Sequence, residues 1–143
     1  MKRCLFIFSI FLLGLSFQQI PSNVDLLCRK WKQVGLKPFK GNYTPIESPM
    51  AITMEFCHDG TYNQAMSIME FNGVWRFNAD STKFVVAFTH MNGKPIKNLS
   101  IDDDKPVDFF IKLTSDTLIY GSEAYYGPEK VFGYSENYYV AVK

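Results

Sequence analysis

The stretch ITMEFCHDGTYNQAMSIMEFNGVWRF, residues 52–77, contains most of what decides the fold. Apolar and polar residues alternate through residues 52–57, which is the pattern of a half-buried β-strand. Asp59-Gly60 then predicts a tight turn, because glycine adopts a positive φ at little cost. An alternating row continues over residues 62–68. The stretch therefore predicts a β-hairpin.

The same signals recur along most of the chain. Asn72-Gly73 predicts a second turn, and no segment is long enough for the helix of a parallel-strand crossover. Regular antiparallel spacing of this kind predicts a sandwich or a meander barrel. Residues 102–106 predict a charged loop, and residues 121–128 a loop that contains glycine and tyrosine. Strands are expected at residues 30–35, 50–57, 62–68, 74–77, 83–89, 94–101 (weakened by Pro95), 107–113, 118–120, 131–132 and 138–142.

The N-terminus has the pattern of a signal peptide. Met1-Lys2-Arg3 precedes an apolar run and a small-residue cleavage site that ends at Ser16, so residues 1–16 are predicted to be removed. The alternative is a membrane anchor, but an apolar run of about a dozen residues is too short to span about 30 Å of hydrocarbon. We expect an exported protein, periplasmic or extracellular, with no membrane span in the mature chain.

The expected mature chain is a linker at residues 17–25 and one domain at residues 26–143, since its length suits a single domain. A short helix is predicted before Trp31, with Ser22 or Asn23 as its N-cap.

Two cysteines, Cys28 and Cys57, remain in the expected mature chain. Disulfides persist in exported proteins. If strand 30–35 pairs antiparallel with strand 50–57 so that Gly35 faces Met50, the same register places Cys28 opposite Cys57. A disulfide between them is predicted. The alternative is a pair of buried free thiols.

Three stretches together carry a family resemblance. They are FCHDGTY (residues 56–62), GVWRFNAD (residues 73–80) and IKLTSDTL (residues 111–118), and they follow a short helix with Trp31 after it. Their order resembles the small secreted lipocalin-like domains of bacterial envelopes, over residues 26–142. The resemblance implies an all-β fold, an antiparallel up-and-down (lipocalin-like) β-barrel of about eight to ten strands with a short N-terminal helix.

Charge and motif content exclude several functions. The formal net charge is +1, so the chain lacks the broad positive field that nucleic acids or anionic membranes attract. His58 and His90 have no partner at a metal-ligand spacing, and Asp102-Asp103-Asp104 lacks the alternating ligands of a calcium loop. No catalytic motif is recognisable. We therefore expect no enzyme activity, no metal and no cofactor.

The remaining candidates are apolar residues of the inward-facing strand phase. They either fill the barrel or line a ligand cavity. The first hypothesis is a binding protein that holds a small apolar ligand. The second is a filled barrel that meets another protein, of unknown identity, through exposed aromatics (Phe110, Tyr125, Tyr126, Tyr138 and Tyr139). The candidate ligand-binding residues are Met54, Phe56, Tyr62, Met66, Trp75, Phe77, Phe84, Phe88, Phe109 and Ile111.

Overall fold

The computed structural model describes residues 22–47, 49–96 and 108–143. The predicted signal peptide, the first part of the linker, most of the weak strand at 94–101 and the charged loop with Asp102, Asp103 and Asp104 lie outside the described residues. The described elements are α1 (Asn23–Leu27), β1 (Lys30–Lys37), β2 (Thr44–Pro45), β3 (Thr53–Phe56), β4 (Thr61–Met66), β5 (Met69–Phe77), β6 (Lys83–Met91), β7 (Lys94–Pro95), β8 (Asp108–Leu113), β9 (Thr117–Tyr126) and β10 (Val131–Ala141).

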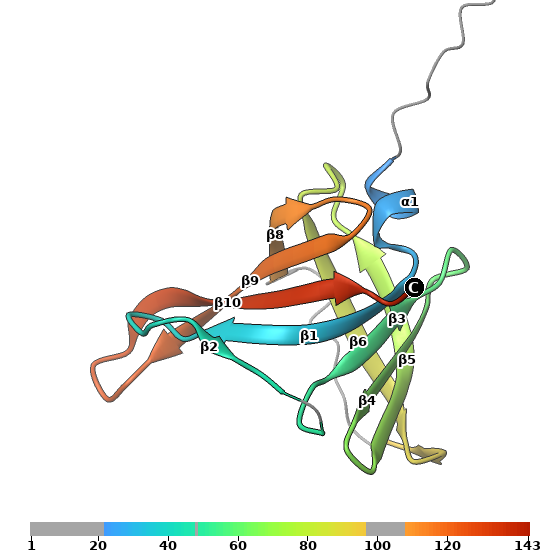
Figure 1. Cartoon of the computed structure of the whole chain (residues 1–143), viewed down its shortest axis with the longest axis horizontal. Coiled ribbons are helices and arrows are strands. Elements are labelled where there is room, and N and C mark those ends of the chain that lie inside the picture. Colours follow the sequence, from blue (N-terminus) through green and yellow to red (C-terminus); the bar gives the residue numbers. More distant parts are fainter. Residues whose placement is uncertain (1–21, 48, 97–107) are drawn as a thin grey trace, which may run out of the picture.

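The described strands form an antiparallel ring. Following the hydrogen bonds, the order is β1, β3, β4, β5, β6, β8, β9 and β10, and β10 pairs back onto β1 (Figure 1). The two-residue strands β2 and β7 pair with β1 and β6 outside this ring. The predicted antiparallel up-and-down barrel with a short N-terminal helix is confirmed. None of the described helices is long and apolar enough to cross a bilayer.

The hairpin that decides the fold forms as predicted at its first turn. Gly60 has a φ of 84°. Its N–H donates to the Cys57 carbonyl at 3.0 Å, and the Cys57 N–H donates to the Thr61 carbonyl at 3.0 Å. These bonds enclose a three-residue loop, a type I turn followed by a glycine bulge. The loop fixes the register of β3 against β4, in which Phe56 faces Tyr62.

The second predicted turn is wrong. Asn72-Gly73 lies inside β5, where the pairing with β6 is irregular, and the chain instead turns at Ser67-Ile68. Ser67 adopts a positive φ of 55° there. A Cβ on Gly73 would lie 2.0 Å from the carbonyl oxygen of Ala87, so the glycine permits close approach of two strands rather than a turn.

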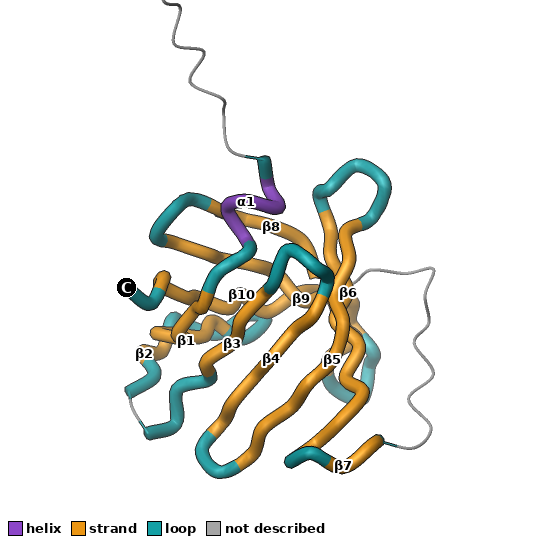
Figure 2. Tube along the Cα trace, turned by 90° about the vertical axis from the view of Figure 1, so that its right-hand side faces the viewer, coloured by secondary structure: helices purple, strands orange, loops and turns teal. Residues whose placement is uncertain are grey.

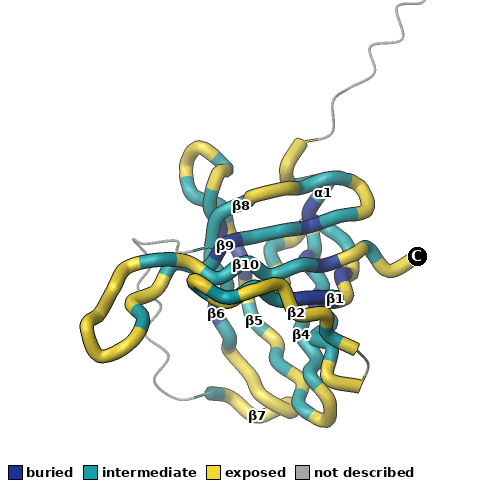
Figure 3. Tube along the Cα trace, turned by 60° about the vertical axis from the view of Figure 1, so that its left-hand side comes forward, coloured by how far each residue is buried: buried dark blue, intermediate teal, exposed yellow. Residues whose placement is uncertain are grey.

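The last hairpin is longer than predicted. Residues 121–128 were expected to form a loop, but β9 continues to Tyr126, and β10 is one strand instead of two short ones. In the described chain, β8 pairs with β9 only as far as Ser122, and β1 pairs with β10 only from Glu136 onward. Residues 123–135 therefore extend beyond the barrel as an arm, mostly exposed at its tip (Figures 1 and 3).

Helix α1 closes one end of the barrel. Ser22 caps it, and Asp25 completes a capping box. The Asn23 amide donates to the Ser81 carbonyl at 3.1 Å, and the His58 ring lies 3.4 Å from the Asp25 carboxylate. The Arg29 guanidinium donates to the Ser115 carbonyl. The helix segment is thus tied to three turns, those after β3, β5 and β8 (Figure 2).

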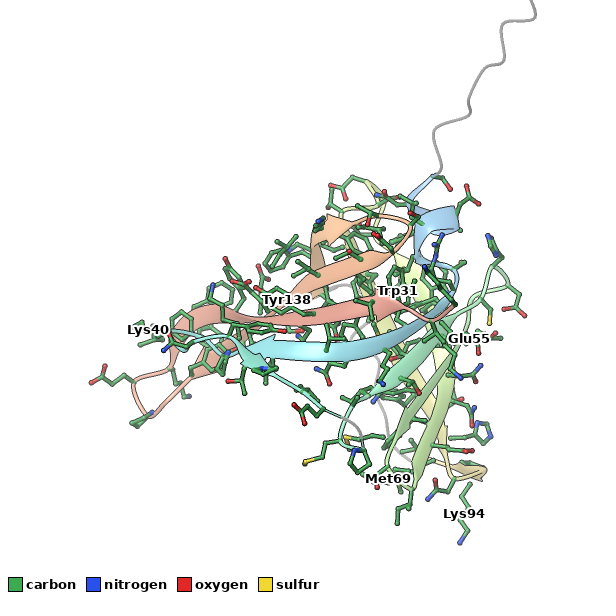
Figure 4. All side chains as sticks on the ribbon, viewed as in Figure 1. Trp31, Lys40, Glu55, Met69, Lys94 and Tyr138 are labelled. Atoms are coloured by element: carbon green, nitrogen blue, oxygen red, sulfur yellow. The ribbon has the colours of Figure 1, made fainter. Side chains whose placement is uncertain are left out.

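The core begins directly beneath this helix. Leu27 and Trp31 are fully buried, and the Trp31 indole N–H donates to the Leu27 carbonyl at 2.9 Å. Trp31 lies near α1, whereas Met69 and Lys94 lie at the opposite end of the barrel (Figure 4). Phe56, Phe84 and Leu118 are the other large side chains that are fully buried.

Candidate functional site

The half of the barrel interior next to α1 is filled by aromatic rings. The ring centroid of Phe56 lies 4.9 Å from Tyr62, 5.5 Å from Trp75 and 5.7 Å from Phe84. These are edge-on contacts between β3, β4, β5 and β6, at distances typical of packed aromatic pairs. Phe110 of β8 stacks on Phe84 at 5.1 Å. The rings meet across the interior, so at this level the barrel is packed.

Most of the predicted ligand-binding residues face this interior. Met54, Phe56, Tyr62, Trp75 and Phe84 are buried, and Phe77 and Phe88 pack against them. Met66 continues the inward row of β4 and is half-buried. The Trp75 indole N–H donates to the Cys57 carbonyl at 2.9 Å, which fixes the ring against the first hairpin.

Phe109 and Ile111 do not face the interior, so their predicted orientation is wrong. Phe109 lies on the outer surface, over Gly121 and 5.2 Å from the Tyr134 ring, and Ile111 is exposed. A β-bulge between Phe110 and Lys112 reverses the alternation within β8. Phe110, predicted to be exposed, is therefore interior.

The interior becomes polar toward the end opposite α1. The Tyr62 hydroxyl donates to the Gln64 side chain at 2.7 Å and also contacts the Met54 sulfur at 3.6 Å. Tyr120 and Tyr139 stack at 5.6 Å with their hydroxyls 3.5 Å apart. Tyr139 was predicted to be exposed but is only 2% exposed, because it belongs to the inward row of β10.

A half-buried carboxyl group belongs to this region. Asp108, the first residue of β8, faces Ser122 on β9, and the Ser122 hydroxyl donates to its Oδ1 at 2.5 Å. Burial raises the pKa of Asp108 to about 6, against the opposing effect of that hydrogen bond. The negative charge of Asp108 in turn contributes to the raised pKa values of the Tyr62, Tyr120 and Tyr139 hydroxyls, for which burial is the larger cause.

We call these residues the interior polar cluster. Gln33 belongs to it, since it is buried and faces Tyr139 across the β1–β10 pairing. Asn137, another inward residue near this end, is half-exposed, as are Gln64 and Ser122. Solvent therefore reaches the interior at the end opposite α1. The members of the cluster are Gln33, Tyr62, Gln64, Asp108, Tyr120, Ser122 and Tyr139.

Sequence reasoning missed all of the cluster except Tyr62. Most acidic residues were expected on turns or in the solvent-facing phase of the strands, and Asp108 was placed in that phase because Val107 and Phe109 flank it. A usable signal was present: Gln64 and Ser122 share the period-two phase of buried neighbours, Tyr62 and Leu118. A polar residue in an inward phase indicates either a hydrogen-bonded core or a binding site.

A second candidate surface is the outer face of the arm. Tyr125 is 70% exposed and Phe132 57% exposed, and their rings contact each other at 5.3 Å. Tyr134 is also exposed. On the other face of the hairpin, Phe39 stacks on Tyr126 at 4.9 Å. Exposed aromatics of this kind are enriched where proteins meet.

The two cysteines lie near each other in the predicted register. β1 pairs with β3 so that Lys30 faces Glu55 and Trp31 faces Met54, which continues to Cys28 and Cys57. Both are half-buried free thiols in this structure. The disulfide itself stays a prediction. In the described ranges no three His, Cys, Asp or Glu side chains converge as metal ligands would.

Comparison with known proteins supports the fold alone. No family model matches the chain, and a search of the curated proteins finds no match. Among solved structures, a DUF4847 family protein from Bacteroides vulgatus ATCC 8482 is similar, with a TM-score of 0.51 and 14% sequence identity. The alignment covers 82% of this chain and 95% of that one. An identity this low indicates a shared architecture and carries no information on function.

Proposed function

We propose that the protein is an exported binding protein that holds a small, largely apolar molecule in the half of the barrel opposite α1. The observation that carries this proposal is the change in the interior along its length. Near α1 aromatic rings fill the barrel, whereas at the other end polar inward side chains are half-exposed. Pockets for small molecules typically combine an apolar lining with a few polar groups that fix orientation.

Phe88 and Phe71 supply the apolar wall of this half. Their centroids lie 5.2 Å apart, and Phe88 also contacts Tyr62 at 5.8 Å. A ligand there would rest its apolar part on these rings and place its polar part against the interior polar cluster. Export rests on the N-terminal sequence, which has the pattern of a signal peptide.

Native mass spectrometry of protein purified from its own host tests the proposal. We expect a species heavier than the mature chain, whose added mass disappears on denaturation. A panel of fatty acids, sterols and tetrapyrroles provides a second readout through melting temperature and tryptophan emission. A bare chain mass, together with no response to any member of the panel, would refute the binding proposal.

The alternative is a filled barrel that binds another protein through the arm, and the exposed pair Tyr125 and Phe132 favours it. The test is cross-linking in the host, comparing the wild type with a Tyr125→Ser, Phe132→Ser double variant. Val140→Ser, at another exposed apolar position, is the matched control. A cross-linked partner that only the double variant loses would support the arm as the functional surface.

A further inference from the structure

The carboxyl group of Asp108 has no cationic partner among the described residues. Its one hydrogen bond there is from the Ser122 hydroxyl. The nearest lysine in the strand pairing is Lys83, which precedes the buried Phe84 on β6. Lys83 faces the outer surface, where its Nζ lies 3.5 Å from the Glu123 carboxylate. A half-buried carboxylate without a cation to balance its charge is costly, and this indicates a role other than stability.

The groups that face Asp108 are hydroxyls and aromatic rings. Tyr120 lies on the inward face of β9, two residues before Ser122, and Tyr139 stacks on Tyr120 at 5.6 Å. The negative charge of Asp108 also contributes to the raised pKa values of these two hydroxyls and of the Tyr62 hydroxyl. Tyrosine rings attract organic cations through their faces, and phenol oxygens accept hydrogen bonds from ammonium groups. A metal ion would need several oxygen ligands with charge, whereas the interior polar cluster contains one carboxylate.

We propose that the barrel selects a ligand with a protonated amino group, which forms an ion pair with Asp108 inside the ring of tyrosines. The inference rests on the proposed binding function and adds the chemical class of the ligand. The ammonium group would donate to the Asp108 carboxylate and to tyrosine oxygens, while its apolar part lies on Phe88 and Phe71. An anionic ligand of the same shape would be repelled by Asp108.

Three probes with one carbon skeleton test the inference: 3-phenylpropylamine, 3-phenylpropan-1-ol and 3-phenylpropionate. Binding is measured by isothermal titration calorimetry at pH 7.5. We expect the amine to bind at least tenfold more tightly than the other two. Asp108→Asn should weaken binding of the amine at least tenfold and should change the affinity for the alcohol by no more than about twofold. Glu123→Gln, which removes a carboxylate on the outer face, is the matched control and should change neither affinity.

The outcomes separate the two proposals. If the alcohol or the carboxylate binds as tightly as the amine, or if Asp108→Asn leaves amine binding unchanged, the inference is overturned and the binding function stands. If none of the three probes binds, the inference is overturned as well. The binding function then falls with it only when the native mass spectrum also shows a bare chain. Circular dichroism of Asp108→Asn establishes that the variant is folded.

Discussion

Oxidation of Cys28 and Cys57 to a disulfide is the change that the strand register predicts most directly. The pairing of Lys30 with Glu55 continues toward the cysteines, because the Phe56 N–H donates to the Arg29 carbonyl at 3.2 Å. Burial raises the pKa of the Cys28 thiol, and the neighbouring Cys57 adds to that shift. The β1–β3 register, continued by two more pairs, places the two thiols opposite each other, and in an oxidising compartment we expect them to form a bond.

The size of the effect follows from the length of chain that the bond encloses. A loop of about 30 residues corresponds to about 3–4 kcal/mol of stabilisation in the chain-entropy treatment. For a domain of this size, that difference shifts the melting temperature by about 10–15 °C. Reduction should therefore lower the melting temperature of the wild-type protein by this amount. Cys28→Ser should melt at the reduced wild-type temperature and should not respond to reductant.

The assay is intact mass after alkylation in denaturant without reductant, on mature protein recovered from the exported fraction. We expect no alkylated cysteine before reduction and two after it. Two alkylated cysteines in the unreduced protein would refute the reasoning. If the disulfide forms but its reduction leaves the melting temperature unchanged, the predicted stabilisation is refuted, whereas the predicted strand register still holds.

Three further predictions concern the hairpin and the interior. Trp75→Ala should lose about 3–5 kcal/mol of stability by urea denaturation, because it removes a buried ring and its hydrogen bond to Cys57, whereas Trp75→Phe should lose less. Gly60→Val should cost more than 1 kcal/mol and Gly60→Asn less, since asparagine tolerates the positive φ of 84°; equal denaturation midpoints would contradict this. The raised pKa of Asp108 means that the folded state binds a proton more tightly than the unfolded state. Asp108 therefore contributes most to the stability of the folded state below about pH 4. This contribution is lost as the pH rises through about 6, a change in the free energy of unfolding of about 3 kcal/mol. Asp108→Asn should remove that part of the difference in stability between pH 4.5 and 7.5, and an unchanged pH profile would contradict the burial of this carboxyl group.

Gly127 shows where one expectation about turns needs revision. Because residues 121–128 are predicted as a loop with no strand register to hold, the sequence predicts that a valine at Gly127 costs less stability than a valine at Gly60. Its φ is 70°, in the same left-handed region as that of Gly60. A valine there would be strained as well, although a Cβ at Gly127 would meet no neighbouring atom within 4 Å.

The sequence predicted the fold because its signals are local. Alternation over residues 52–57 and the Asp59-Gly60 turn specify a hairpin without reference to the rest of the chain. The candidate site was predicted only in its apolar part. Phe109 was misplaced because the bulge in β8 depends on pairing with β9, and Asp108 was missed because the phase of a short strand is reversed by one extra residue.

The closure of the ring has a consequence for how the chain acquires its structure. β1 is the first strand of the ring, yet one of its edges pairs with residues 136–141 of β10, the last strand. Contacts between segments so distant in sequence are slow to form, and during synthesis the partner does not yet exist. An emerging chain therefore cannot close the ring until its final strand is free. A chain shortened by its last few residues would leave an edge of β1 unpaired and prone to join other molecules.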